Sequence, residues 1–329
     1  MVNYGAAPGL HAPMGHQDLG HHPLMGDTIV KMPDHAKSRK RMNIMGICLS
    51  LFLPWTMFCV IAYALSFSLH YDNPVAPWFF VGFGAVLALA FLGMAAAQMS
   101  RKPVPGDIYA GTWNVFLFLT LTIAVIAGTS LGNSNYETNM QQYYDLLNLN
   151  DYIDVDPSRM RGQQMMDAGR VKFVKNTKIN LGKAYAFQNL DTYCVAPITI
   201  FSEDVGAMLP LASYDFWAVG TNCCGSNQTT DEVDFQCGDY NSKYARQGLR
   251  LMKDDQRAFF RLAVQQASSA HQLVAQHPLF FYWASDALDL LESIRVKGFQ
   301  TYAIGMIGHF VFQLFLVLIA MYVFAQWGF

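Results

Sequence analysis

Four long hydrophobic stretches constrain the fold of this 329-residue chain more than any other feature. They cover about residues 44–69, 78–99, 108–131 and 302–327, and none of them contains Asp, Glu, Lys or Arg. A hydrocarbon core of roughly 30 Å takes about 20 apolar residues in a helix. Helices are expected because backbone polar groups in lipid must be satisfied within the segment. The sequence therefore predicts a membrane all-α protein with four transmembrane helices.

The distribution of charged residues divides the chain into four parts. Residues 1–42 begin with a segment rich in Gly, His and Pro, which predicts a flexible inner N-terminal tail. Residues 43–132 hold the first three transmembrane helices with short loops, and residues 299–329 hold the fourth. Residues 133–298 carry most of the charged side chains. We expect them to form one large outer domain, extracellular or lumenal.

This outer domain is predicted to be disulfide-bonded and mainly helical. Apolar residues recur at three- and four-residue spacing over 242–276, which indicates an amphipathic helix. A second helix is expected near 280–294, running into the fourth span, and helix is also predicted for 133–184. Residues 185–240 are rich in Tyr, Phe, Val, Thr and Gly, which favours loops and short strands around the cysteines.

Two basic clusters predict the orientation in the membrane. Residues 37–41 contain four Lys and Arg side chains, and Arg101 and Lys102 lie in the short turn between the second and third spans. Cytoplasmic loops carry an excess of Lys and Arg, so both clusters are placed on the inner side. The N- and C-termini then share the inner, cytoplasmic or equivalent, side. The plasma membrane or an endomembrane is the expected location, with a thylakoid or mitochondrial inner membrane as the alternative.

Four of the six cysteines lie in the predicted outer domain: Cys194, Cys223, Cys224 and Cys237. An even number in an oxidising compartment predicts two disulfides. Adjacent cysteines rarely bond each other, so Cys223 and Cys224 are each expected to pair with one of the other two. A zinc site is the alternative, without the usual CxxC spacing. Asn227 begins an Asn-Gln-Thr sequon, which makes it a glycosylation candidate.

The layout of the whole chain resembles the tetraspanin family. The resemblance consists of four spans, a small first loop, a short inner turn and a large second outer loop that contains Cys223-Cys224-Gly225. In tetraspanins this triplet anchors two disulfides that shape a variable, partner-binding subdomain. Asn114 and Gln313 also look like that family's intramembrane polar residues. The cysteine order departs from the family, because Cys194 precedes the triplet.

Polar residues in the spans are few. Asn114 and Gln313 are expected to hydrogen-bond between helices. His309 is either an axial ligand for a haem or chlorophyll or a neutral side chain bonded between helices. Cys48, near the inner end of the first span, is a palmitoylation candidate.

Small residues recur at four-residue spacing in the spans, a pattern that allows helices to approach closely. The pairs are Gly46 and Ser50, Gly84 and Ala88, Gly93 and Ala97, and Ala124 and Gly128.

These features favour a non-enzymatic membrane organiser that contacts other integral membrane proteins and lipid. The sequence contains no GxSxG, HExxH or P-loop motif, so no catalytic residue, metal or cofactor is predicted beyond contact with lipid or pigment. The net charge of −2 gives no argument for nucleic-acid binding. The alternative is an accessory structural subunit of a large photosynthetic or respiratory membrane complex.

Overall fold

The computed structural model describes residues 44–100, 108–226 and 233–326. Within them, four helices are long and apolar enough to span a membrane: α1 (Ile44–Ser66), α3 (Ala76–Met99), α4 (Ile108–Asn135) and α7 (Ala287–Gln326). The prediction of an integral membrane protein with four spanning helices is confirmed at this level. The predicted N-terminal tail, residues 1–42, lies outside the described residues.

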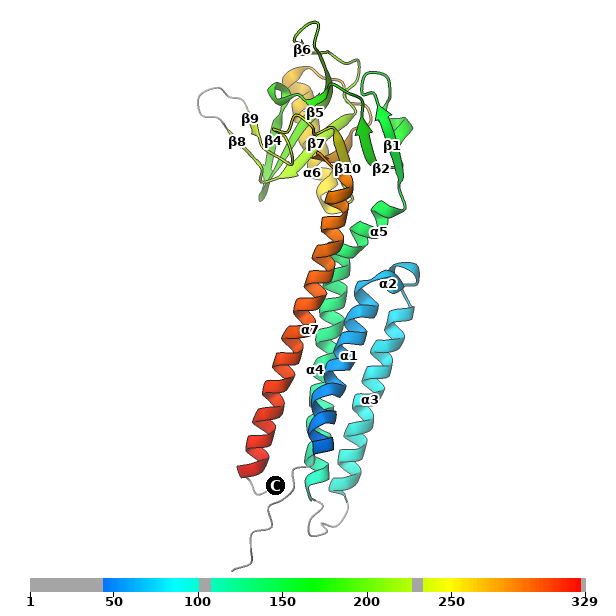
Figure 1. Cartoon of the computed structure of the whole chain (residues 1–329), viewed down its shortest axis with the longest axis vertical. Coiled ribbons are helices and arrows are strands. Elements are labelled where there is room, and N and C mark those ends of the chain that lie inside the picture. Colours follow the sequence, from blue (N-terminus) through cyan, green and yellow to red (C-terminus); the bar gives the residue numbers. More distant parts are fainter. Residues whose placement is uncertain (1–43, 101–107, 227–232, 327–329) are drawn as a thin grey trace, which may run out of the picture. The chain divides into compact units, whose positions relative to one another are not determined.

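The four helices pack into a bundle around α1, which contacts the other three (Figure 1). The short helix α2 (Ser68–Asp72) connects α1 to α3. The interior is formed by large apolar side chains, among them Ile61, Leu65 and Leu121, which are fully buried. Within the bundle, each helix is apolar on all sides. It buries the side chains that face its neighbours, and its other apolar side chains are exposed.

Two of the spanning helices continue beyond the bundle. After α4 the chain passes through a π-helix, η1 (Tyr136–Met140), into α5 (Gln141–Leu147). The 40 residues of α7 form one uninterrupted helix. Near this transition the buried Asn135 donates a hydrogen bond to the Gly298 carbonyl oxygen over 3.1 Å. This bond joins α4 to α7 where both leave the bundle.

Residues 150–284, which we call the sheet domain, form a nine-stranded mixed sheet and a separate two-stranded one. The strands are β1 (Asn150–Val155), β2 (Ala168–Phe173), β3 (Thr177–Ile179), β4 (Tyr185–Asn189), β5 (Asp191–Ser202), β6 (Ala207–Met208), β7 (Phe216–Thr221), β8 (Cys224–Ser226), β9 (Val233–Phe235), β10 (Gln247–Arg250) and β11 (Leu279–Ala284). Two 3-10 helices, η2 (Gly162–Met165) and η3 (Leu181–Lys183), lie between strands.

The large sheet has the strand order β1-β2-β10-β11-β7-β5-β3, with β4 and β6 also paired to β5. Strands β1 and β2 are parallel, as are β11 and β7, and the other pairs are antiparallel. The small sheet is the antiparallel pair β8 and β9.

Both faces of the large sheet are covered by apolar side chains. On β7, Phe216 and Ala218 join one core cluster, whereas Trp217 and Val219 join the other. This alternation is the two-residue period of a strand. The second cluster is completed by α6 (Asp254–His271), whose buried face contributes Phe260, Ala263, Val264 and Ala267.

The prediction of a mainly helical outer domain is not confirmed, because the sheet dominates this region. The predicted helix over 242–276 contains β10 before α6 begins at Asp254. The predicted helix near 280–294 begins instead as β11, and helix in 133–184 ends at Leu147 apart from η2 and η3. Strand β11 (LFFYWA) is almost entirely buried, so it lacks the polar alternation that identifies a half-exposed strand. The predicted short strands around the cysteines are present as β4 to β9.

Candidate functional site

The contact between α1 and α7 is built around a proline. Pro54 lies inside α1 and has no backbone N–H, so the Ser50 carbonyl oxygen, four residues earlier, lacks its helical donor. Gln313 of α7 donates a hydrogen bond from Nε2 to this oxygen over 2.7 Å. Both Ser50 and Gln313 are fully buried. The polar residue predicted in the fourth span therefore satisfies a backbone group that the proline leaves free.

Two further hydrogen bonds tie α7 to α1. Trp55 Nε1 donates to the Met306 carbonyl oxygen over 3.1 Å, and the Tyr302 hydroxyl donates to the Cys59 carbonyl oxygen over 3.3 Å. All three bonds join a side chain to backbone, so they fix α7 against α1 along much of the span.

His309 lies in the same contact. Its ring stacks on Phe58 of α1 with the ring centroids 4.2 Å apart, and only 7% of the residue is exposed. Among the described residues, three polar atoms in this contact are buried without a hydrogen-bond partner: Ser50 Oγ, His309 Nε2 and Gln313 Oε1. The buried position of Nε2 means that a pigment could reach it only if α1 and α7 separated.

The predicted polar and small residues of the other spans fall into two groups. Asn114 Nδ2 donates to Gln98 Oε1 over 2.9 Å and so links α4 to α3. Gly84 and Gly128 are buried at close contacts with α1; a Cβ at Gly128 would lie 3.2 Å from the Phe58 carbonyl oxygen. Ala88 and Ala124, their partners in the pattern, are also buried.

Two of the remaining small residues do not mediate packing among the described residues. Gly93 and Ala97 are exposed on α3, and a Cβ at Gly93 would meet nothing within 4 Å. Gly46 is half-buried near the N-terminal end of α1, two residues before the exposed Cys48. Palmitoylation of Cys48 stays a prediction.

The four cysteines of the sheet domain form two disulfides, Cys194–Cys224 and Cys223–Cys237. Cys194 lies on β5, Cys224 begins β8, and Cys237 follows β9. Each member of the adjacent pair is thus bonded to one of the other two cysteines. Asn227, the glycosylation candidate, lies outside the described residues.

Asp215 was not identified from the sequence, and it is a buried carboxylate that accepts several hydrogen bonds. It is 2% exposed and accepts hydrogen bonds from Ser213 Oγ at 2.7 Å and from the backbone N–H of Gly162, Gln276 and His277 at 3.0 to 3.3 Å. Burial alone would raise the pKa of this carboxyl, but the hydrogen bonds outweigh burial and lower it. Asp215 thereby joins three loops before β7, β11 and η2.

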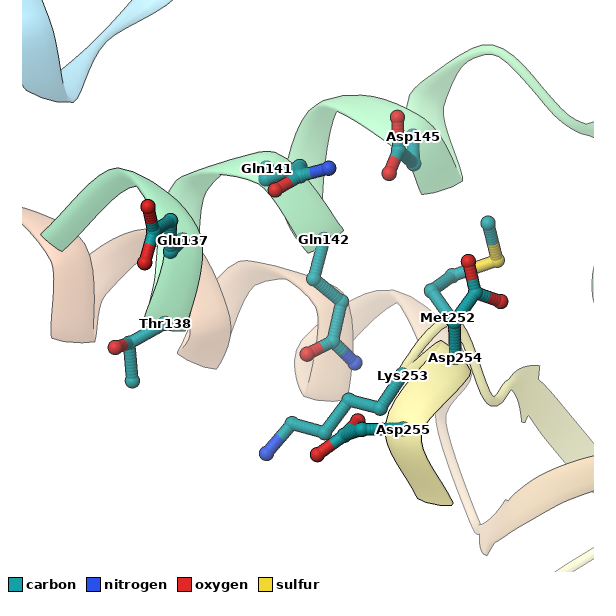
Figure 2. A pocket seen from close by; sticks show the side chains of 9 residues that line it. All are labelled: Glu137, Thr138, Gln141, Gln142, Asp145, Met252, Lys253, Asp254 and Asp255. Atoms are coloured by element: carbon teal, nitrogen blue, oxygen red, sulfur yellow. The ribbon is translucent and has the colours of Figure 1, made fainter. Parts of the chain in front are cut away.

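A groove of about 520 Å³ lies between η1 and α5 on one side and the start of α6 on the other (Figure 2). It is lined by Glu137, Thr138, Gln141, Gln142, Asp145, Met252, Lys253, Asp254 and Asp255. Figure 2 shows Gln142 extending from α5 toward the start of α6. Asp145 already accepts a hydrogen bond from the Tyr71 hydroxyl, and Asp254 forms an ion pair with Arg257 at 2.9 Å. These bonds are typical of a solvated acidic surface.

Comparisons of the chain with protein-family models, with curated proteins and with solved structures found no match. The resemblance to tetraspanins therefore stays a prediction.

Proposed function

We propose that this protein is a non-enzymatic membrane organiser that holds other integral membrane proteins through lateral contacts. The supporting observation is the outward position of Gly93 and Ala97 on α3. At 100° per residue they lie on the side of α3 opposite the buried Gly84 and Ala88. Small residues on an exposed helix face allow the backbone of a second helix to approach closely.

The same face of α3 extends toward the other end of the span. Gly82 lies eleven residues before Gly93, close to three full turns, and a Cβ there would also meet nothing within 4 Å. Val86 lies between them on this side and is 66% exposed. We call Gly82, Val86, Gly93 and Ala97 the outward face of α3, and we propose it as the contact surface for a partner helix.

The sheet domain supplies the second contact surface in this proposal. A buried cluster of Leu146, Leu249, Ala287 and Leu291 joins α5, β10 and α7. The domain is therefore packed onto two helices that continue into the bundle, so that a partner held in the bilayer would meet the domain in a fixed orientation. We propose the region from Cys223 to Cys237 as the part of the domain that contacts partners.

The proposed placement puts the sheet domain outside and both termini inside, at the plasma membrane or an endomembrane. The basic clusters of the sequence support this orientation. Protease added to sealed, right-side-out vesicles should then digest the sheet domain and spare residues 1–36. Cleavage within 1–36 would reverse the proposed topology.

The alternative function is an accessory structural subunit of a photosynthetic or respiratory complex, at a thylakoid or mitochondrial inner membrane. The observation that favours it is the lack of a hydrogen-bond partner at His309 Nε2, and ligation of this buried nitrogen would require α1 and α7 to separate. A bound haem or chlorophyll would give the purified protein a visible absorption band that His309→Ala removes. No such band in protein purified with its native lipids would leave His309 as a helix-packing residue.

The organiser proposal is tested by mild detergent extraction and identification of the proteins that co-purify. An organiser should bring down several membrane proteins at low stoichiometry, whereas a complex subunit should bring down one fixed set. Gly93→Leu should reduce this co-purification at least severalfold. Ala85→Leu is the matched control, because it also places a leucine side chain at an exposed position of α3, about 80° away from Gly93. Equal losses in both variants, or none in either, would contradict the proposed contact.

A further inference from the structure

The two disulfides of the sheet domain meet at one place. The Sγ atoms of Cys194, Cys223 and Cys237 all lie within 4.8 Å of one another. Cys223 and Cys237 are bonded to each other, whereas Cys194 belongs to the second disulfide, with Cys224. A sulfur of one disulfide therefore lies beside both sulfurs of the other.

Backbone hydrogen bonds hold these segments together in addition to the disulfides. Asn222 donates its N–H to the Thr192 carbonyl oxygen over 2.7 Å, which ties the segment before Cys223 to β5. Gln236 donates its N–H to the Cys223 carbonyl oxygen over 2.8 Å. This bond joins the residue after β9 to the residue before β8. Opening one disulfide therefore leaves its thiols close to the other.

Gly220 provides the space for this arrangement. It lies on β7 directly opposite Cys194 in the strand register. A Cβ at Gly220 would come within 2.8 Å of both Cβ and Sγ of Cys237. The missing side chain lets Cys237 lie against the sheet next to Cys194.

The four sulfurs differ in access to solvent. Cys194 and Cys237 are buried, with 0% and 3% of each residue exposed. Cys223 and Cys224 are half-buried. An external thiol therefore reaches this cluster through the adjacent pair, and the buried sulfurs are protected from direct attack.

We propose that these four cysteines form a thiol–disulfide exchange site in which Cys194 changes its partner from Cys224 to Cys223. A dithiol reductant first attacks Cys223 Sγ, releases the Cys237 thiolate, and then closes to its own cyclic disulfide, which frees the Cys223 thiolate. That thiolate attacks Cys194 Sγ. The Cys194–Cys223 bond forms, the Cys194–Cys224 bond breaks, and the electron pair leaves on the Cys224 sulfur.

The product carries one disulfide and two thiols, at Cys224 and Cys237. Cys224 is half-buried at the start of β8, so its thiolate can attack a disulfide of a partner protein. A mixed disulfide then forms, the partner's disulfide breaks, and its second sulfur leaves as a thiolate. This exchange site lies in the sheet domain, and its proposal does not rest on the proposed contact at α3.

Cys237→Ser in the full-length protein tests the exchange step without any reductant, because it leaves Cys223 as a free thiol. After acid quench and mass spectrometric mapping, we expect both Cys194–Cys224 and Cys194–Cys223 linkages. Maleimide labelling of Cys224 under native conditions should be at least tenfold above that in the double variant Cys223→Ser/Cys237→Ser. The double variant is the matched control, since it also removes the attacking Cys223 thiol and keeps the Cys194–Cys224 bond.

Unfolded chains would also scramble their disulfides, and a Cys223–Cys224 linkage marks them, because adjacent cysteines rarely bond in folded proteins. If Cys237→Ser fails to fold by this criterion, the wild-type protein decides. Limited reduction with dithiothreitol should then give the Cys194–Cys223 linkage. Finding Cys194–Cys224 as the sole linkage of Cys194, in folded Cys237→Ser or in partly reduced wild type, would overturn the proposal.

Discussion

Gln313 donates a hydrogen bond across the bundle to the Ser50 carbonyl oxygen, the backbone acceptor that Pro54 leaves without a helical donor. The proline and the glutamine lie more than 250 residues apart in the sequence. The glutamine supplies the hydrogen bond that the proline removes from α1. An unsatisfied carbonyl in hydrocarbon costs free energy because no water can bond it.

This pairing predicts that Gln313 and Pro54 are energetically coupled. Gln313→Leu should lower the melting temperature of the detergent-solubilised protein, because the Ser50 carbonyl loses its donor. Pro54→Ala restores a backbone N–H within α1 and should recover part of that loss in the Gln313→Leu background. The coupling free energy from the double-mutant cycle should be about 1 kcal/mol, as for other hydrogen bonds between membrane helices. Strictly additive effects of the two substitutions would argue against the pairing.

Glycines that face the bundle should respond to added bulk, and those on the outward face of α3 should not. A Cβ at Gly132 would lie 2.6 Å from Leu65 Cβ and 3.2 Å from the Ala62 carbonyl oxygen. Gly132→Ala should therefore destabilise the bundle by about 1–3 kcal/mol. Gly93→Ala, with no neighbour within 4 Å, is the control and should leave the melting temperature unchanged or raise it slightly. The reverse order of stabilities would mean that α1 and α4 do not approach closely at Gly132.

Asp215 should make the sheet domain sensitive to acid. Its pKa is lowered in the folded state by the hydrogen bonds that outweigh burial, so the charged carboxylate stabilises the fold. That stabilisation is fully present above the unfolded-state pKa of about 3.9 and is lost as the pH falls through the lower folded-state pKa.

Asp215→Asn provides the test of this role. The side-chain NH2 of asparagine would face at least one of the N–H donors and could not accept its hydrogen bond. We expect this loss to cost about 1–3 kcal/mol of stability near neutral pH. The variant should also lose part of the acid dependence when tryptophan fluorescence follows unfolding against pH. Ser213→Ala removes a single donor and should have a smaller effect. An unchanged acid midpoint in Asp215→Asn would show that other carboxyls govern the transition.

The Cys223–Cys237 bond should stabilise the sheet domain without affecting the bundle. It joins residues 14 apart, and a loop of this size is worth on the order of 3 kcal/mol in the chain-entropy model. The double variant Cys223→Ser/Cys237→Ser should make the sheet domain more sensitive to protease while the protein still inserts into membranes. If the variant no longer inserted into membranes, folding of the sheet domain would be required before the bundle could insert, contrary to this prediction.

The membrane-spanning helices were predictable because lipid imposes one requirement over their whole length. Uninterrupted apolar residues with no ionisable side chain are sufficient to identify them, and their bounds differ from the prediction mainly where α4 and α7 continue beyond the bundle. The sequence also indicated the polar side chains of Gln313 and Asn114. It did not indicate their partners, since those depend on which helices become neighbours.

The sheet domain was harder to predict because its central strands are buried on both faces. Seven consecutive residues of β5 are buried, and β11 has one residue that is not, so neither strand shows the alternation of polar and apolar residues. Asp215 was equally hidden, because its four donors come from three separate segments of the chain. The adjacency of Cys223 and Cys224 excluded a disulfide between them and so reduced the possible pairings. The sequence did not indicate that Cys194 lies close to Cys223 and Cys237, because this depends on Gly220 and the strand register.

The most direct test of the organiser proposal is photo-crosslinking from Val86, which is 66% exposed on the outward face of α3. A photoreactive amino acid at this position, in native membranes, should form adducts with other integral membrane proteins. Those adducts should disappear when Gly93→Leu is added. The same probe at Val311, 58% exposed on α7, is the control and should form adducts mainly with lipid. Lipid adducts alone from Val86, or protein adducts that Gly93→Leu leaves unchanged, would contradict the account.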